Sequence, residues 1–409
     1  MISPAHTRDD TDAPSVWDAL VGQDDTAGVL RAAAAAAVEI TAGRPSGAGA
    51  MTHAWLFTGP AGSGRSVAAR AFAAALQCER SAEPGCGVCA GCCTVRAGTH
   101  PDVRLVVPQG LSISVDETRA LIQNSARLPS AGRWQIVIIE DADRLGERAA
   151  NALLKAIEEP SPRTIFMLCT PSSHPDDVPV TIRSRCRLVA LRTPPAAAVA
   201  QVLQRDGMDA RTAEWAAAAG QGHIGRSRRL ARDSEARQRR AAVLSIPGSL
   251  TSLRACLDAA DHLVGAAEAE AAAMSAELDA GETEALQTAL GVGGTGKGTA
   301  AAARASSGAV KDREKRQKSR ATRTQRDAID RTLVDLAAFY RDVLLRHAGA
   351  QVAAAHPDFD ADVRAVALRV APAGVLRRLD AVLACRQALE QNVKPRVAVE
   401  AMTAALRLP

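Results

Sequence analysis

The chain has 409 residues, of which 47% are hydrophobic and 2% aromatic, and its formal net charge is +5. A chain of this length predicts two to three domains with sizeable cores. No apolar run approaches the ~20 residues of a membrane span, and residues 1–14 lack the apolar region of a signal peptide. Composition therefore excludes an integral membrane protein and predicts a soluble, cytoplasmic one without a membrane partner.

A phosphate-loop motif occurs near the start of the chain. Residues 59–66 read GPAGSGRS and match the consensus G-x-x-x-x-G-K-[ST] except at Arg65, where lysine is expected. Residues 53–58 predict a buried strand before this loop, and residues 66–73 predict a helix after it. Strand, glycine-rich loop and helix is the arrangement that the motif requires. A chance glycine-rich turn is the alternative interpretation.

Each residue type in this loop has a chemical role. Gly59, Gly62 and Gly64 allow backbone N–H groups to surround phosphates, and the hydroxyl of Ser66 is a ligand for Mg²⁺. Lysine reaches the β and γ phosphates as a compact charge, whereas the guanidinium of Arg65 is longer, planar and forked. The sequence therefore predicts the fold of an ATPase with a degenerate site for ATP or ADP and Mg²⁺.

A cysteine cluster follows the first predicted helix. It consists of Cys78, Cys86, Cys89 and Cys92, with Cys93 adjacent. Four thiolates at this spacing suit tetrahedral Zn²⁺ and leave no open position for catalysis, which predicts a structural zinc knuckle at about residues 78–93. A disulfide framework is the alternative, but a chain without a secretory signal is expected to keep its thiols reduced. Cys93 is predicted to be a bystander.

Further apolar runs predict the rest of a sheet. They are continuous rather than alternating, which is typical of strands buried on both faces of a parallel sheet. Two helices are predicted between them, at residues 115–128 and 145–159. The predicted strands are residues 103–107, 135–139, 164–169 and 187–191. Together with the phosphate loop, they predict an α/β domain that covers residues 1–193 and ends near Thr193, where Pro194 and Pro195 break the chain.

An acidic pair follows the strand at residues 135–139. In P-loop ATPases this place holds Asp, which organises Mg²⁺, and then Glu, which orients the attacking water. Here the order is reversed, to Glu140 and Asp141. Since ~1 Å of misplacement can cost on the order of a hundredfold in rate, this reversal predicts impaired hydrolysis. Two acids solvated at the end of a strand is the alternative.

An arginine lies just before the last predicted strand, in the tripeptide Ser184-Arg185-Cys186. A loop arginine at this place in a P-loop assembly can act in trans and stabilise charge on the γ phosphate of a neighbouring subunit. A solvated arginine is the alternative, because Arg183 and Arg187 lie close by.

The rest of the chain is predicted to be helical. Residues 194–245 predict a small helical lid, and residues 246–409 predict a separate helical domain with apolar positions at helical spacing. Residues 291–325 are rich in glycine, alanine and serine and then in basic residues, and are predicted to be disordered. Residues 291–298 form a second near-match to the phosphate loop. They are interpreted as a decoy, because no strand precedes them and no apolar helix follows.

The positive charge of the chain comes from one segment. Residues 311–326 contain eight basic and two acidic side chains, so this segment carries +6 and the remainder of the chain sums to −1. The basic pI therefore does not indicate a broadly charged binding face.

These motifs, in this order, resemble the clamp-loader family of AAA+ proteins, which serves bacterial DNA polymerase III. The resemblance is strong over residues 16–193 and weaker beyond, and residues 291–325 have no counterpart in it. The matching landmarks are residues 21–23, 59–66, 84–89, 100–102, 136–141, 151–160 and 184–186.

The resemblance implies an AAA+ domain with a zinc knuckle, a lid and a helical C-terminal collar. It also implies a subunit of a hetero-pentamer that opens a sliding clamp and sets it on primed DNA in replication, with tau/gamma and delta subunits as partners. Because Arg65, Glu140 and Asp141 depart from the ATP-hydrolysing pattern, the resemblance favours the stator of the complex, whose own ATPase is predicted to be weak or absent. That stator lends the arginine of its SRC motif, here Arg185, to the adjacent ATP site. Thr170 falls at the sensor-1 place of the family.

Two rival functions remain. The first is the ATP-hydrolysing tau/gamma role, which Arg65 and the reversed acidic pair disfavour. The second is an unrelated nucleic-acid-binding AAA+ protein that uses residues 311–326. Because this tract lacks interleaved aromatic residues, it offers only salt-sensitive phosphate contacts, and a solvated linker is favoured.

Overall fold

The computed structural model describes residues 15–45, 47, 49–80, 82–289 and 299–407. The chain divides into two compact units: residues 1–108 with 112–227, and residues 109–111 with 228–409. The N-terminal segment at residues 1–14 and the near-match at residues 291–298 lie outside the described residues. Among the helices that are described, none combines the length and the apolar character needed to span a bilayer.

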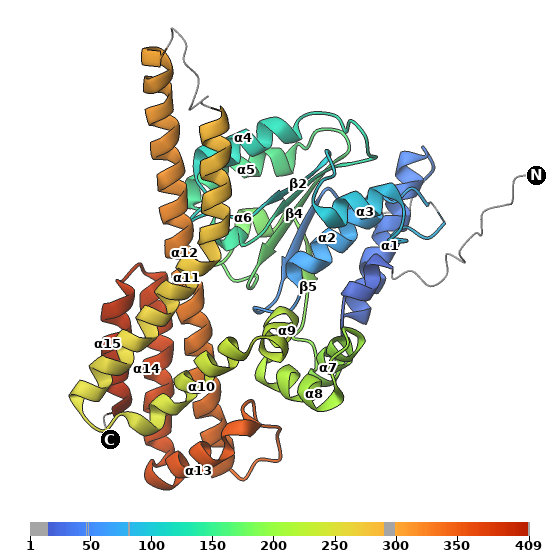
Figure 1. Cartoon of the computed structure of the whole chain (residues 1–409). Helices are drawn as coiled ribbons and strands as arrows, with labels where there is room; N and C mark the ends of the chain where they lie inside the picture. Colours follow the sequence, from blue (N-terminus) through green and yellow to red (C-terminus); the bar gives the residue numbers. More distant parts are fainter. Residues whose placement is uncertain (1–14, 46, 48, 81, 290–298, 408–409) are drawn as a thin grey trace, which may run out of the picture. The chain divides into compact units, whose positions relative to one another are not determined.

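The first unit is built on a parallel sheet of five strands, as predicted (Figure 1). The strand order is β2-β3-β4-β1-β5. The strands are β1 (Ala54–Thr58), β2 (Val103–Val106), β3 (Gln135–Ile139), β4 (Thr164–Thr170) and β5 (Arg187–Ala190). Burial on both faces is confirmed for the central strands β3, β4 and β1. It was wrong for β2 and β5, because these strands lie at the edges of the sheet and keep exposed side chains.

Helices cover both faces of this sheet (Figure 1). One face packs against the short helix η1 (Val16–Ala19) and helices α1 (Asp24–Thr41), α2 (Arg65–Leu76) and α3 (Ala90–Ala97). The other face packs against α4 (Val115–Ser125), α5 (Glu147–Glu158) and α6 (Val180–Arg183). Successive side chains of β1 point to opposite faces of the sheet. Trp55 and Phe57 pack in the core on the side of α2, and Leu56 packs in the core on the side of α5. The α/β class that the sequence predicts is confirmed.

Three short helices follow the sheet. They are α7 (Ala196–Arg205), α8 (Ala210–Ala219) and α9 (Ile224–Arg232). Helix α7 buries Val199 and Leu203, and α8 buries alanines at helical spacing. The boundary between the two units falls inside α9, so the domain borders at residues 193 and 245 stay predictions.

The second unit is a set of helices around one core. It contains α10 (Ser234–Ser249), α11 (Leu253–Ala289), α12 (Thr299–His347), η3 (Pro357–Phe359), α13 (Asp360–Arg369), α14 (Pro372–Glu390) and α15 (Pro395–Arg407). Leu333, Leu336, Phe339 and Val343 of α12 are fully buried in this core, at the helical spacing that the sequence shows. The all-helical prediction for this region is confirmed.

The predicted disorder of residues 291–325 needs a correction. From Thr299 onward this segment belongs to α12. Its alanine, arginine, lysine and glutamine residues are strong helix formers. In addition, Arg320 forms ion pairs with Asp279 and Glu282 of α11 at 3.3 and 2.7 Å. Composition alone did not reveal that an acidic helix faces the basic tract.

Candidate functional site

The phosphate loop lies at the carboxyl edge of the sheet. Thr58, the last residue of β1, is in register with Thr170 at the end of β4 and with Ala190 at the end of β5. The loop follows directly and leads into α2, whose first residue is Arg65. This strand-loop-helix arrangement agrees with the prediction from the motif.

Two glycines of the loop are required by close approach. Gly59 has a φ of 156°, and a Cβ placed there would lie 2.6 Å from the carbonyl oxygen of Leu191. Gly62 has a φ of 85°, and a Cβ there would lie 2.6 Å from the Cβ of His223. Any other residue at either position would clash. His223 precedes α9, so the turn between α8 and α9 packs directly on the phosphate loop.

The guanidinium of Arg65 turns back onto the protein. It donates a hydrogen bond of 2.7 Å to the carbonyl oxygen of Gly59 and lies 4.0 Å from a carboxylate oxygen of Asp141. The side chain of Arg65 is only 15% exposed. The guanidinium therefore binds the loop backbone and faces Asp141, where a lysine would present its charge to phosphate.

The other acid of the pair is held by a second arginine. Glu140 accepts a hydrogen bond of 2.6 Å from Arg70, further along α2. Asp141 adopts a left-handed backbone conformation with a φ of 47°. The two carboxylates thus face different cations of α2. The structure brings Glu140 and Asp141 to the phosphate loop but engages both of them in ion pairs within the chain.

The remaining predicted nucleotide residues also lie at this edge. Thr170 is fully buried, and its hydroxyl donates a hydrogen bond of 2.8 Å to the carbonyl oxygen of Ser172. Ser66 is half-buried in the first turn of α2. Gly64 caps α2 in a left-handed conformation. The structure therefore places all predicted nucleotide residues at one site, whereas their roles stay predictions.

Sequence reasoning missed two further polar residues here. Gln23 is buried, and its side chain donates to the carbonyl oxygen of Ser63 at 3.3 Å and accepts from the N–H of Arg192 at 3.2 Å. It thereby ties the phosphate loop to the chain after β5. Asp143 has a buried carboxylate oxygen, and burial, followed by the charge of Asp141, raises its pKa above the usual range. The only available signal was the stretch at residues 21–23, which matched the family without an assigned role.

The four predicted metal ligands come together. The sulfur atoms of Cys78, Cys86, Cys89 and Cys92 all lie within 4.8 Å of one another. Cys78 Sγ is 3.7 Å from Cys86 Sγ and 3.9 Å from Cys89 Sγ. A tetrahedral Zn²⁺ with Zn–S bonds of ~2.3 Å places its sulfurs ~3.8 Å apart. The cluster is therefore compatible with a metal site of this kind.

The knuckle is fixed to the rest of the unit by backbone contacts. Gly85 has a φ of 105°, and its carbonyl oxygen accepts a hydrogen bond of 3.0 Å from the N–H of Val16. The indole N–H of Trp17 donates to the carbonyl oxygen of Pro84 at 2.9 Å. Cys93 is exposed, and its sulfur lies near the carbonyl oxygens of Gly87 and Val88 instead of the cluster.

Arg185 lies just beyond α6 and is 40% exposed. Its Nε is 2.6 Å from a carboxylate oxygen of Glu158 at the end of α5. One terminal nitrogen, Nη1, donates to the carbonyl oxygen of Thr181 at 2.9 Å and to the hydroxyl of Ser184 at 3.2 Å. The guanidinium is thus oriented by its own unit while it stays accessible to solvent.

The neighbouring arginines differ from Arg185. Arg187 donates to the carbonyl oxygens of Gly49 and Ala50 at 3.0 and 2.8 Å, and its guanidinium lies 5.1 Å from the ring centre of Trp55. Arg187 is therefore structural. Arg183 is exposed and makes one long contact, at 3.4 Å, to the carbonyl oxygen of Ser173.

Comparison with known proteins finds sequence matches for this region. Residues 44–195 match the family model described as DNA polymerase III, delta subunit. The DNA polymerase III subunit delta′ of Pseudomonas aeruginosa is 40% identical over 156 residues, which cover 37% of this chain and 47% of that protein. The subunit tau of Bacillus subtilis is 38% identical over 138 residues, which cover 34% of this chain and 24% of that protein. The chain thus spans about half or less of the curated relatives that it matches.

A solved structure is also similar. It is a DNA polymerase III gamma subunit-related protein from Thermotoga maritima, which aligns over 86% of this chain and 93% of that chain with a TM-score of 0.35 and 16% identity. Because this structural similarity is low, the assignment depends on the sequence matches. Over residues 44–195 the chain is therefore similar in sequence to subunits of DNA polymerase III, the delta-prime subunit among them.

Proposed function

We propose that this chain is a delta-prime-like stator of a clamp loader. In this role it joins tau/gamma and delta subunits in a hetero-pentamer that loads the sliding clamp onto primed DNA for the polymerase III holoenzyme. The stator does not hydrolyse ATP itself. Instead, Arg185 acts in the ATP site of the adjacent subunit.

The observation that carries this proposal is the internal pairing of the phosphate loop. Arg65 binds the carbonyl oxygen of Gly59 and faces Asp141, and Arg70 binds Glu140. A nucleotide with Mg²⁺ needs a free cation for its phosphates and a free carboxylate for its metal. Both would first have to leave partners within the chain. This arrangement supports a rigid subunit with weak or absent ATPase activity.

The accessibility of Arg185 supports the second half of the proposal. An arginine finger must reach the γ phosphate of another subunit, so it cannot be buried in its own. Arg185 is 40% exposed and oriented by Glu158. Val180 at the start of α6 and Leu188 in β5 are exposed apolar residues that could pack on a neighbour. In the transition state the guanidinium stabilises charge that develops on the γ phosphate.

We further propose that the four clustered cysteines hold a structural zinc ion. Their sulfur separations suit tetrahedral coordination, and all four positions come from protein. When bound, zinc supplies a cross-link between the end of α2 and the start of α3 and takes no part in catalysis. Cys89 has two roles in this proposal. It is a zinc ligand, and its sulfur accepts a hydrogen bond from the N–H of Cys92 and so caps α3.

The decisive experiment replaces Arg185 in a reconstituted pentamer. Arg185→Ala is expected to leave folding, zinc content and assembly unchanged and to slow clamp-stimulated ATP hydrolysis by at least tenfold, since arginine fingers contribute factors on the order of 10³ or more. Turnover at saturating ATP should fall while the apparent affinity for ATP changes little, because the finger acts in the transition state.

Arg183→Ala is the matched control, because Arg183 is exposed on the same segment without an ion pair of its own among the described contacts. Arg187→Ala is less suitable, because Arg187 packs on Trp55. The proposal is wrong if Arg185→Ala complexes hydrolyse ATP and load clamps like the parent. It is also wrong if Arg183→Ala is equally impaired, or if Arg185→Ala prevents assembly.

A further inference from the structure

Helices α11 and α12 extend beyond the core of the second unit as a polar hairpin, which comprises residues 272–289 and 299–327 (Figure 1). Among the described residues, α12 contributes to the apolar core only from Ala328 onward, and α11 contributes only as far as Ala267. Within residues 311–327 there is no large apolar or aromatic side chain. Burial of apolar surface therefore does not explain why these turns of α12 are present.

The inner side of the polar hairpin is neutralised by ion pairs. Arg320 binds Glu282 at 2.7 Å and holds the pKa of that carboxyl below its usual range. The side chain of Arg320 is only 15% exposed. Closer to the core, Gln325 donates to Glu268 at 3.0 Å and Arg331 to Glu270 at 2.9 Å. The acidic helix α11 thus neutralises the face of α12 that packs against it.

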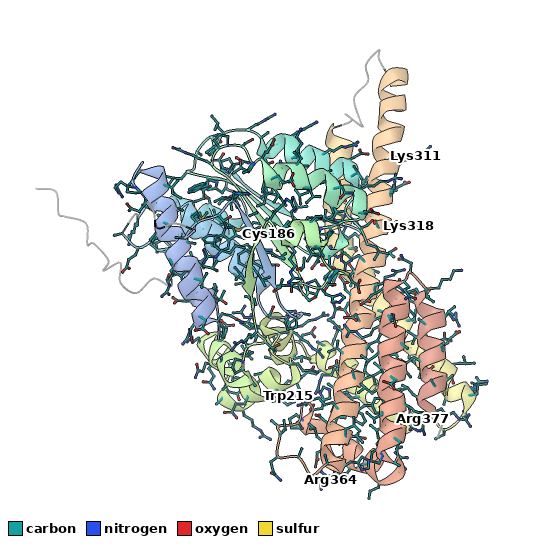
Figure 2. The ribbon with its side chains drawn as sticks, turned by 180° about the vertical axis from the view of Figure 1, so that it is seen from behind. Cys186, Trp215, Lys311, Lys318, Arg364 and Arg377 are labelled. Carbon is teal, nitrogen blue, oxygen red and sulfur yellow. The ribbon has the colours of Figure 1, made fainter. Side chains whose placement is uncertain are left out.

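The outer side carries lysines instead. Lys311, Lys315 and Lys318 are all exposed, and Figure 2 labels the first and last of them on α12. Spacings of four and three residues place the three ammonium groups within an arc of roughly 60° on the helix. Arg320, nine residues beyond Lys311, lies about half a turn away. Glu314, also exposed, is the acid at the edge of this lysine face.

We propose that the lysine face, formed by Lys311, Lys315 and Lys318, binds the phosphate backbone of duplex DNA. The three residues span ~10.5 Å along the helix, which is about three base-pair steps of 3.4 Å. Ammonium groups on flexible stems contact phosphates as point charges and need no fixed partner geometry. This interaction is independent of base sequence.

The composition of the face favours DNA over other acidic partners. Protein interfaces depend on buried aromatic, apolar or arginine anchors, and the lysine face itself contains none of these. Single-stranded nucleic acid is bound largely by stacking on aromatic rings, which are also missing from this segment. Lysines alone suit the regular phosphates of a duplex.

The test measures binding of the isolated full-length chain to a fluorescein-labelled 30-base-pair duplex by anisotropy at several salt concentrations. The triple variant Lys311→Gln/Lys315→Gln/Lys318→Gln is expected to bind about tenfold or more weakly at low salt. The slope of log K against log salt should become shallower by up to ~2.7, or ~0.9 for each phosphate that the variant no longer neutralises.

The matched control is Arg254→Gln/Lys394→Gln/Arg407→Gln, which removes the same charge from exposed positions elsewhere in the second unit. It should retain most of the affinity and the slope of the parent. The proposal fails if the lysine variant binds like the parent, if the control is equally weakened, or if polyglutamate of matched length binds as tightly as DNA. Because the chain is tested alone, the result is independent of the proposed role of Arg185.

Discussion

Asp102 shows how one side chain fixes a local structure. This buried carboxylate accepts hydrogen bonds from the backbone N–H groups of Ser130, Ala131 and Gly132 and from the hydroxyl of Ser130. Burial alone would raise the pKa of a carboxyl group, but these donors lower that of Asp102 to about 2. The turn before β3 is therefore held by an ionised carboxylate.

We expect Asp102→Asn to destabilise the first unit by about 2 kcal/mol at pH 7, because a pKa lowered from 3.8 to about 2 corresponds to that much free energy. A lowered pKa contributes stability above the unfolded value, and this contribution is lost as pH falls through the folded value. The difference between parent and variant should therefore shrink from pH 4 toward pH 2. Urea unfolding followed by tryptophan fluorescence measures it, since all four tryptophans lie in the first unit.

Asp116→Asn is the control for this prediction, because Asp116 is 95% exposed. It should unfold like the parent at every pH. An Asp102→Asn chain as stable as the parent at pH 7 would contradict the pKa argument.

Arg65 is the second residue with a testable role. We expect Arg65→Lys to leave ATP hydrolysis by the isolated chain negligible. The substitution supplies the usual lysine, but Glu140 remains bound to Arg70 and the two acids remain in reversed order. A misplacement of ~1 Å suffices for a loss on the order of a hundredfold. Phosphate release with ATP and Mg²⁺ measures this, and robust turnover by the unmodified chain would instead support the tau/gamma role.

At the scale of elements, the four-cysteine knuckle leads to a prediction about zinc content. We expect one zinc per chain in protein purified without chelator, retained in Cys93→Ser and lost in Cys89→Ser. Cys89 provides both a ligand and the cap of α3, whereas the exposed Cys93 lies outside the cluster. The sheet should remain folded in both variants, because its core consists largely of apolar residues from the strands and α2. Elemental analysis and circular dichroism measure the two outcomes, and a metal-free parent would overturn the zinc assignment.

The secondary structure elements also show where sequence reasoning succeeds. The central strands were predictable because continuous apolar runs flanked by turns occur where helices cover both faces of a sheet. The edge strands β2 and β5 were predicted to be buried on both faces, but they keep exposed side chains. Apolar composition does not reveal which strand lacks a neighbour on one side. Helix α12 was missed between residues 299 and 325, because its stability depends on pairing with α11.

At the scale of the whole molecule, the match to the family model covers part of only one of the two units. The family model matches residues 44–195, which lie almost entirely within the first unit. The polar hairpin belongs to the second unit, outside that match. The positive charge is concentrated at residues 311–326 of this hairpin, where Arg320 is paired with α11 and Lys311, Lys315 and Lys318 are exposed. Net charge therefore says little about binding until the partners of each cation are known.

The sequence by itself determined the α/β class, the phosphate loop with Arg65, the grouping of four cysteines and the position of Arg185. These features depend on local patterns, such as apolar runs, glycine spacing and CxxC steps, that can be read without long-range contacts. Only the tertiary structure decided that Arg65 binds Gly59 and faces Asp141, that Glu158 orients Arg185, and which side of α12 remains charged. Each of these pairs joins residues from different elements, and the partners of a charged side chain are fixed by how the elements pack.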